Sequence, residues 1–275
     1  MFKISVIIPT YKPQDYLWEC LESLVAQTFP KENFEVILVL NGCMEPYKSA
    51  IENYIAEKMQ GMNVNFIHTE VGGVSNARNL ALDQMKGEFI TFIDDDDFVS
   101  PQYLESLYEK ADAETISICY PHAFKDGNVE TAVHYPMRNV YDEFHDKNNI
   151  GISSKIWKFF SGPWMKLIPM SFIQDRRFDV RFKNGEDSLF MFLISDKFKK
   201  FAFASKDAVY YRRYREGSAV TGKRNKKSII MNGIRLFCST TNIWIRAPFK
   251  YNFPFFIRMS FGYVKGMVVY CLGKV

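Results

Sequence analysis

Four consecutive carboxylates, Asp94–Asp97, directly follow the apolar segment Phe89–Ile93. The β-favouring residues of that segment predict a buried strand that ends at an exposed sheet edge. Two carboxylates ~5 Å apart repel each other by roughly 3 kcal/mol at an effective dielectric near 20, so a cation among them would relieve a large repulsion. Oxygen ligands at a strand end suit Mg²⁺ or Mn²⁺, with diphosphate oxygens of a ligand completing the shell. The alternative is a solvated acidic turn, in which Ser100 caps a helix that begins at Pro101.

Strand and helix periodicities alternate through the first 120 residues. The pattern predicts strands over 4–8, 34–40, 64–67, 88–93 and 115–120, and helices over 17–25, 45–59, 75–86 and from 101. Such alternation predicts an α/β fold, a mostly parallel sheet with helices on both faces. Ligands bind at the carboxyl ends of the strands in such sheets. These ends carry Pro9–Tyr11, Asn41–Gly42 and Asp94–Asp97, which we therefore expect to converge on one cleft.

The pattern weakens after Tyr120. Asp126-Gly127 predicts a hairpin turn, and the polar stretch 134–150 is expected to be irregular. Helical spacing returns over Asp187–Phe198, followed by short strands at 201–204 and 208–211. From Lys227 onward the chain is helical in pattern, aromatic and basic.

Composition and cysteine usage limit the classes to which the protein can belong. The chain has 275 residues, of which 47% are hydrophobic and 24% charged, as in ordinary globular proteins. Its five cysteines are scattered without a CxxC pair, which excludes a disulfide framework or zinc site of the usual spacing. The N-terminus lacks the pattern of a signal peptide, and no apolar run reaches the ~18 residues of a membrane span. We therefore expect a cytoplasmic protein.

The net charge of +4 conceals an uneven distribution. From Arg212 onward there are 13 Lys and Arg against one acid, Glu216, whereas the preceding residues carry an acidic excess. Such a tail predicts an anionic partner. It suits an interfacial helix pair on anionic lipid, at the inner face of the cell membrane. A helical cap on the core or on a second subunit of a homo-oligomer is the alternative; nucleic acid is disfavoured because no recognised module accompanies the charge.

Several motifs together resemble a known family. The chain resembles the family-two inverting glycosyltransferases, which have the GT-A fold, and among them the bacterial enzymes of surface-polysaccharide synthesis. The resemblance covers about residues 3–218 and rests on the segments SVIIPTYK (5–12), EVILVLNG (35–42), GVSNARNLAL (73–82), KGEFITFIDDDD (86–97), WMKL (164–167), GED (185–187) and RYREGS (213–218). It implies a GT-A domain over 1–220, with a nucleotide-sugar half about 1–120 and an acceptor half about 121–220. The basic residues 221–275 would form a helical extension.

The resemblance assigns the binding of a nucleotide-sugar donor to particular residues. These are Pro9, Thr10, Tyr11, Asn41, Arg78, Asp94, Asp95, Arg213, Arg215 and Ser218. Leu40 and Asn41 stand where the family often has two Asp; Asn41 could still accept a hydrogen bond from a pyrimidine N–H, or form a plain Asn-Gly turn. Arg213, Arg215 and Ser218 would close over the diphosphate as a mobile lid, or else form a solvated basic strand end. Arg78 would brace the nucleotide or the acidic run, or form an ordinary ion pair.

The same resemblance implies the catalytic, metal and acceptor residues. Asp94 and Asp96 would hold Mn²⁺ or Mg²⁺, and Asp187 would be the general base that takes the acceptor hydroxyl proton. Glu186 and Asp187 could instead only cap their helix, a role that needs no catalysis. Acceptor contacts would come from Trp164, Lys166, Glu186 and Asp97.

The implied reaction is inverting transfer of a sugar from a nucleotide-diphosphate sugar, most readily a UDP-sugar, to a hydroxyl of a glycan. The acceptor would be a lipid-linked oligosaccharide in the synthesis of capsule, O-antigen or a similar polysaccharide. The alternative is a catalytically silent nucleotide-sugar-binding subunit, which the departure at Leu40 and Asn41 motivates. A nucleotidyltransferase is disfavoured because no phosphate-cradling glycine-rich signature follows the first strand.

Overall fold

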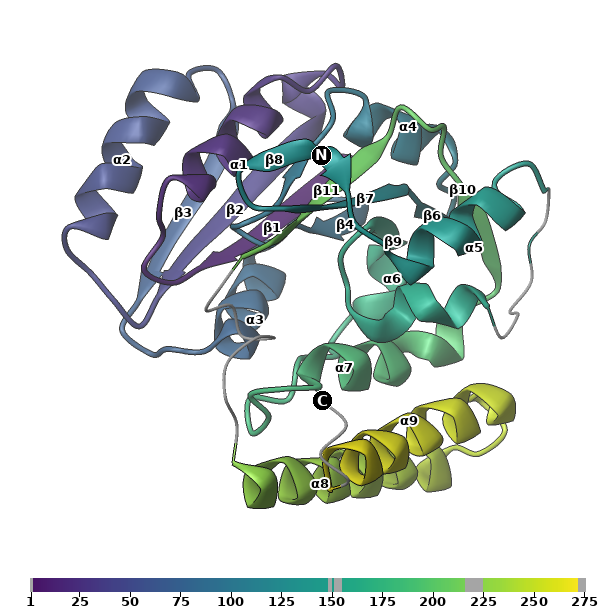
Figure 1. The fold of residues 1–275 in the computed structure, drawn as a ribbon. Helices are drawn as coiled ribbons and strands as arrows, with labels where there is room; N and C mark the ends of the chain where they lie inside the picture. The colour runs from purple at the N-terminus through teal and green to yellow at the C-terminus, as the bar shows by residue number, and fades with distance from the viewer. Residues whose placement is uncertain (1, 148–149, 151–154, 216–224, 272–275) are drawn as a thin grey trace.

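The computed structural model describes residues 2–147, 150, 155–215 and 225–271. A seven-stranded sheet forms its centre, in the order β10-β6-β9-β4-β1-β2-β3 (Figure 1). The only antiparallel pairs among these described strands are those of β9 with β4 and β6. The strands are β1 (Ile4–Thr10), β2 (Phe34–Asn41), β3 (Asn63–Thr69), β4 (Phe89–Phe92), β6 (Thr115–Ile118), β9 (Lys166–Pro169) and β10 (Lys200–Phe203). The predicted mostly parallel α/β fold is confirmed.

The central strands are apolar because helices cover both faces of the sheet. Every residue of β1 and β2 is buried, and the two strands run in parallel register with Val6 opposite Val36. The helix α1 buries Leu17, Cys20, Leu21 and Leu24, one stripe at helical spacing. The helices α1 (Tyr16–Val25) and α4 (Tyr103–Glu109) lie on one face and α3 (Val74–Gln84) on the other, while α2 (Tyr47–Lys58) follows β2 (Figure 1).

A second sheet lies against the end of the first. Its order is β5-β11-β7-β8, with β5 (Phe98–Val99), β7 (Tyr120–Lys125), β8 (Asn128–Ala132) and β11 (Val209–Tyr214). The predicted hairpin turn at Asp126-Gly127 is confirmed between β7 and β8. The single strand expected over 115–120 is wrong in one respect, because the chain changes sheets at Cys119. Since β11 pairs with β5, the strand that follows the acidic run, its arginines come close to Asp94–Asp97.

The expectation of an irregular stretch over 134–150 is also wrong in part. The helix α5 (Pro136–Phe144) occupies most of it and buries Met137, Val140 and Tyr141, which are spaced three and four residues apart. Proline at the first position of a helix costs no hydrogen bond there, so Pro136 starts the helix rather than preventing it. The remaining short elements are η1 (Lys31–Asn33), η2 (Ile156–Ser161), α6 (Met170–Ile173), α7 (Glu186–Ile194) and η3 (Ser195–Lys197).

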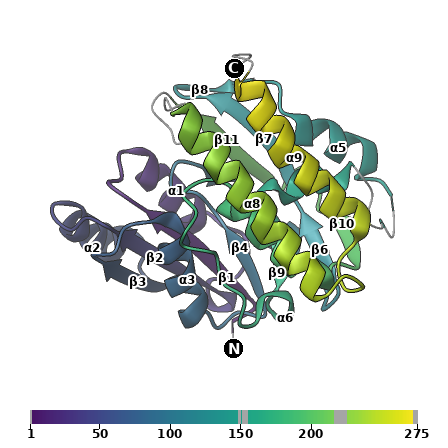
Figure 2. The same cartoon turned by 90° about the horizontal axis from the view of Figure 1, so that it is seen from below.

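The C-terminal part is a pair of antiparallel helices, α8 (Lys226–Arg246) and α9 (Phe253–Cys271), which we call the C-terminal hairpin. Seen from below in Figure 2, both helices lie across the molecule. Leu236 of α8 packs between Phe182 and Leu189, and Phe255 of α9 packs 5.7 Å from the ring of Phe192 in α7. The hairpin therefore supports α7 from below. No helix in the described ranges combines the length and the hydropathy that crossing a membrane requires.

Candidate active site

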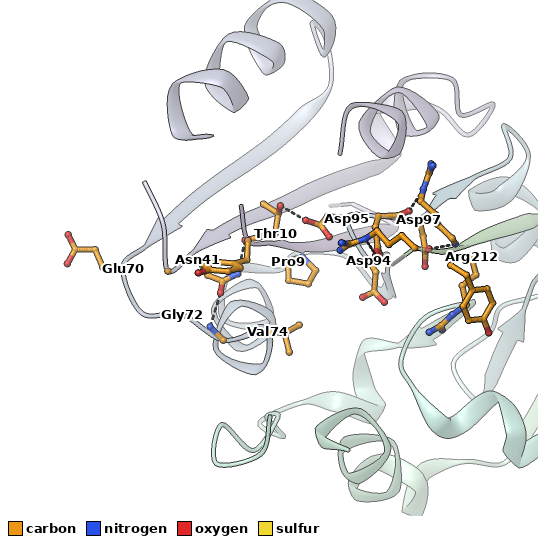
Figure 3. A pocket seen from close by; sticks show the side chains of 17 residues that line it. Pro9, Thr10, Asn41, Glu70, Gly72, Val74, Asp94, Asp95, Asp97 and Arg212 are labelled. Carbon is orange, nitrogen blue, oxygen red and sulfur yellow. Dashed lines mark hydrogen bonds and ion pairs between the residues drawn. The ribbon is translucent and has the colours of Figure 1, made fainter. Parts of the chain in front are cut away.

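A cavity of about 590 Å³ opens at the carboxyl ends of β1, β2 and β4 (Figure 3). The predicted convergence of the three strand ends is confirmed. The lining residues are Pro9, Thr10, Tyr11, Asn41, Gly42, Glu70, Gly72, Gly73, Val74, Asp94, Asp95, Asp96, Asp97, Arg212, Arg213, Tyr214 and Arg215. The lining side chains that were not predicted are those of Glu70, Val74, Arg212 and Tyr214; the Gly72-Gly73 turn is the sequence signal that could have pointed to the first two.

The amide of Asn41 ties three loops of the cavity together. Its Nδ2 donates to the carbonyl oxygen of Thr10 at 2.7 Å, and its Oδ1 accepts from the N–H of Gly73 at 2.8 Å. An ionised Asp could accept from Gly73 but could not donate to Thr10, so Asn is the residue that satisfies both partners. The contact of Asn41 with a nucleotide base stays a prediction, and it would use the second lone pair of Oδ1.

The turn after β2 requires glycine. Gly42 has φ +68°, and a Cβ built there would lie 2.8 Å from the Cα of Gly72. Any side chain would therefore push the β2 turn away from the loop that begins α3.

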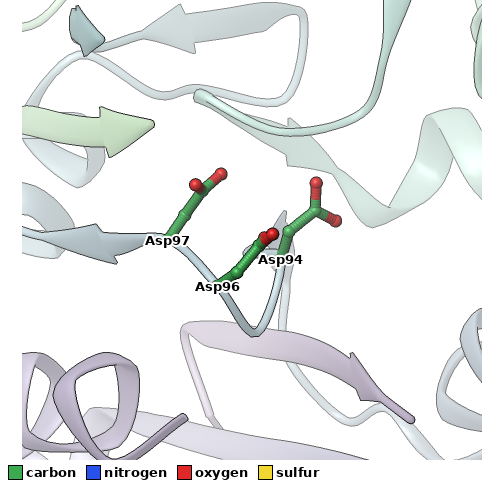
Figure 4. A group of neighbouring side chains, drawn as sticks. All are labelled: Asp94, Asp96 and Asp97. Atoms are coloured by element: carbon green, nitrogen blue, oxygen red, sulfur yellow. The ribbon is translucent and has the colours of Figure 1, made fainter. Parts of the chain in front are cut away.

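The acidic run forms a cluster at the other side of the cavity. One carboxylate oxygen each of Asp94, Asp96 and Asp97 can be chosen so that all three lie within 4.8 Å of one another (Figure 4). Each residue also has one partner in the protein: Asp94 has Arg78 at 2.9 Å, Asp96 has Nε of Arg215 at 2.8 Å, and Asp97 accepts from the N–H of Arg213 at 2.7 Å.

This donor set fits a small divalent cation. Hard oxygen ligands in a compact group are what Mg²⁺ and Mn²⁺ prefer. Burial raises the pKa of Asp97 well above its ordinary value, with Asp96 and Asp94 adding to the shift. Desolvation also raises the pKa of Asp95 to about 7, against the effect of the hydroxyl that Thr10 donates to it. Negative charge is thus costly here, and a cation would lower that cost.

A single guanidinium joins the acidic cluster to Asp187. Arg78, in α3, is 2% exposed; one of its NH2 groups pairs with Asp94 and the other with Asp187 in the first turn of α7. The Phe178 ring lies 5.3 Å from the guanidinium carbon. Burial raises the pKa of Asp187 to about 7, although Arg78 acts in the opposite direction. Two carboxylates that are 93 positions apart in the sequence therefore share one cation.

Residues 211–215 contact the acidic run through two arginines. The guanidinium of Arg213 pairs with Glu19 and Asp126 and donates to the backbone oxygen of Asp96. Arg215 pairs with Asp96 and lies 4.7 Å over the ring of Tyr16. Both arginines are paired with carboxylates of the protein in this structure, and their movement as a lid stays a prediction. Ser218 lies outside the described residues.

Arg212 lines the cavity together with Arg213 and Arg215, but it forms no direct ion pair among the described residues. Against the effect of burial, Tyr135, Asp97 and Asp94 raise the pKa of its guanidinium. It stacks over the Trp164 ring at 5.0 Å. Alternation along β11 sends Arg212 and Arg213 to opposite faces, and the sequence did not show which one would be paired. Trp164 itself is half-buried beside Arg212 and does not line the cavity.

Lys166 is not available to contact a glycan acceptor in this structure, contrary to the expectation. It is 0% exposed, and its Nζ donates to the carbonyl oxygens of Gly162 and Trp164 at 2.8 and 2.5 Å. Burial lowers its pKa to about 7. Its role is to hold the loop that carries Trp164. Glu186 is likewise buried, in the first turn of α7.

The family follows from comparison with known proteins. The model of the family described as Glycosyl transferase family 2 matches residues 5–176, which is more than half of the chain. The chain belongs to this family. The matched range contains the cavity's strand ends, the acidic cluster and Arg78, while Asp187 and β11 lie beyond it.

Named relatives within the glycosyl transferases include TarS of Staphylococcus aureus, described as a poly(ribitol-phosphate) beta-N-acetylglucosaminyltransferase. It is 29% identical over 233 residues, which cover 79% of this chain and 36% of TarS. A Campylobacter jejuni protein, described as GalNAc(5)-diNAcBac-PP-undecaprenol beta-1,3-glucosyltransferase, is 28% identical over 81% of this chain and 68% of its own length. The chain spans only 25–36% of several longer relatives, TarS among them.

Solved structures agree on the GT-A fold. The structure of TarS residues 1–349 in complex with UDP-GlcNAc superposes with a TM-score of 0.69 and 24% identity, covering 88% of this chain and 67% of that one. The mannosyltransferase PcManGT of Pyrobaculum calidifontis, in complex with GDP-Man and Mn²⁺, has a TM-score of 0.64 and 17% identity, covering 97% of this chain and 73% of that one. These likenesses establish the architecture around the cavity.

Proposed function

We propose that this chain transfers a sugar from a UDP-sugar to a hydroxyl of a glycan acceptor, with inversion at the anomeric carbon. Membership of glycosyl transferase family 2 supports the reaction class. The UDP-GlcNAc complex of TarS supports a UDP-sugar donor, and the name of the C. jejuni relative supports an acceptor carried on a polyprenyl diphosphate. Such an acceptor suits the synthesis of a surface polysaccharide at the cytoplasmic face of the membrane.

The observation that carries the proposal is the link from Asp187 through Arg78 to Asp94. It places a candidate proton acceptor beside the carboxylates that would face the diphosphate. A base with a pKa near 7 is ionised in about half of the molecules at neutral pH and can take a hydroxyl proton. In this reaction Asp187 deprotonates the acceptor hydroxyl, and that oxygen attacks the anomeric carbon as the bond to the diphosphate breaks.

Asp94 and Asp96, with Asp97 beside them, would hold Mn²⁺ or Mg²⁺. When bound, such an ion stabilises the negative charge that grows on the leaving diphosphate. We assign Arg212 to the same charge from the protein side, because it lines the cavity and forms no direct ion pair in the described ranges. Tyr11, half-exposed at the cavity edge, would stack on the base of the nucleotide.

The test is a screen of nucleotide sugars for hydrolysis or transfer, with and without Mn²⁺. We expect UDP-sugars to be turned over, chelation with EDTA to abolish turnover, and Mn²⁺ or Mg²⁺ to restore it. Asp96→Asn should weaken metal-linked donor binding, and Lys58→Gln on the outer surface of α2 serves as a control. Tight metal-linked donor binding without turnover on any acceptor would favour the silent binding subunit instead.

A further inference from the structure

The outer side of α8 carries a row of exposed apolar residues. Met231, Ile234 and Ile245 are exposed, at positions that repeat along one side of the helix. The opposite side of α8 contains Leu236 and Thr240, which are buried against the body of the protein. The exposed row therefore faces away from the domain.

The outer side of α9 carries a second row, with residues three or four positions apart. Its members are Phe253, Ile257, Phe261, Val264 and Val268. Phe261 is 65% exposed, whereas Phe255 and Phe256 on the inner side are buried in the main core. Because α8 and α9 pack side by side, with their inner sides on the domain, the two rows form one outer face (Figure 2). Phe249, in the connection between the helices, is fully exposed at one end of this face.

Cations accompany this face, and no acid does. The exposed ones are Lys227, Arg235, Arg246, Lys250, Arg258 and Lys265, and none of them forms an ion pair within the described residues. The chain contains no Asp or Glu after Glu216. Soluble monomers rarely expose so large an apolar surface without a partner for it.

We propose that the outer face of the C-terminal hairpin docks on a bilayer that contains anionic lipid. Apolar rows flanked by Lys and Arg are the surface that lies in the interface of a membrane, with the apolar side chains among the acyl chains and the cations at the phosphates. A second copy of the chain fits less well, because a two-fold contact would bring the same cations together with no acid to oppose them.

This docking would also orient the active site. The hairpin lies directly under α7, and Asn232 and Leu236 of α8 contact the loop at Asn184 and Gly185 that precedes Asp187. A membrane below the hairpin therefore lies on the same side of the molecule as the proposed base. The benefit of orienting the active site toward the membrane rests on the proposed lipid-linked acceptor, whereas membrane binding itself does not depend on any activity.

The test is cosedimentation of the full chain with vesicles. We expect binding to vesicles of phosphatidylcholine mixed with phosphatidylglycerol at low salt, weaker binding to phosphatidylcholine alone, and loss at about 0.5 M salt, where exposed charges are screened. Arg258→Glu with Lys265→Glu should lower partitioning at least tenfold. Ile257→Ser with Phe261→Ser should lower it by a similar factor, because fewer apolar groups would enter the lipid.

Two pairs of exposed residues outside the hairpin are matched controls. Lys58→Glu with Lys206→Glu makes the same change in net charge, and Val129→Ser with Val180→Ser likewise replaces two exposed apolar side chains by serine. Both should bind vesicles within twofold of the wild type.

Failure of the wild type to bind anionic vesicles at low salt would overturn the proposal, as would equal losses in hairpin and control variants. A dimer in sedimentation velocity that the hairpin variants dissociate would assign the face to a second copy. UDP-sugar hydrolysis measured without vesicles reports separately on the proposed function.

Discussion

The acidic cluster and the helix α7 bring carboxylates to the two sides of one guanidinium, Arg78, by different means. In the cluster, Asp94, Asp96 and Asp97 are held by an arginine or a backbone N–H each, so their positions depend on a balance of charge. Asp187 lies in the first turn of α7, a helix whose other contacts are mostly apolar, and the C-terminal hairpin packs beneath it. The difference teaches that the proposed donor side should be sensitive to charge and the side of the proposed base to packing. Arg78 contacts both sides, because it pairs with Asp94 and with Asp187.

The largest effect is expected from Asp187→Asn. The substitution keeps the size of the side chain and removes its ability to take a proton, so turnover should fall at least a hundredfold while donor binding persists. Steady-state transfer and donor titration measure the two quantities. The wild-type kcat should rise with pH to a plateau above about 7, because burial raises the pKa of Asp187 to about 7 and only the ionised form acts as a base.

Glu186→Gln provides the comparison for that variant, since Glu186 precedes Asp187 in the same helical turn. We expect a loss smaller than tenfold, which is about 1.4 kcal/mol in barrier height. Near-normal turnover in Asp187→Asn, or a larger loss in Glu186→Gln, would move the role of base away from Asp187.

Arg78→Lys should give an intermediate effect and would show whether the two sides are coupled. A lysine keeps the charge, but its single ammonium cannot present the fork that contacts Asp94 and Asp187 together. We expect kcat to fall by about tenfold at pH 7 and its rising limb to move upward by roughly one pH unit, because Arg78 now lowers the pKa of Asp187. A lower kcat with an unshifted pH profile would mean that Arg78 acts on the donor side alone.

Sequence patterns were sufficient for the parts of the molecule where chemistry and periodicity coincide. The alternation of buried strands and helices predicted the central sheet, and the strand ends predicted the cavity, because parallel strands bring their carboxyl ends to one edge. Asp94–Asp97 could be singled out since four carboxylates at a strand end need a physical reason.

Other parts depended on which partner a side chain meets across the fold. Both Arg212 and Arg213 line the cavity, and nothing local distinguishes Arg212, which stacks over Trp164, from Arg213, which pairs with Glu19 and Asp126. Lys166 was expected near an acceptor, but β9 lies inside the sheet, and its neighbours bury the whole side chain. In both cases the deciding contacts join residues that are distant in the sequence.

Lys166→Met tests the contribution of a buried side chain to stability and leaves Asp187 unchanged. The variant leaves the carbonyl oxygens of Gly162 and Trp164 without their donor, which should cost about 1–3 kcal/mol in the free energy of unfolding. Because burial lowers the pKa of Lys166 to about 7, the unfolded chain binds one more proton than the folded chain from about pH 7 to 10. Wild-type stability should therefore rise relative to the variant over this range, as measured by urea unfolding. The KM for acceptor should change little; a large rise in it would restore Lys166 to the acceptor site.

Gly185→Ala should have the smallest effect on turnover, yet it most directly probes how the hairpin positions Asp187. Gly185 has φ +83°, and a Cβ there would lie 2.5 Å from Cδ1 of Leu236. The backbone strain alone is worth roughly 1–2 kcal/mol, and the contact with Leu236 would displace α8 or the first turn of α7. Gly127→Ala is the matched control, because Gly127 has φ +82° and its Cβ would meet nothing within 4 Å. Both variants should lower Tm by a few degrees, but only Gly185→Ala should also lower kcat, and Leu236→Ala in the same chain should restore part of it. Equal kcat values in the two glycine variants would mean that the hairpin stabilises α7 without setting the position of its carboxylate.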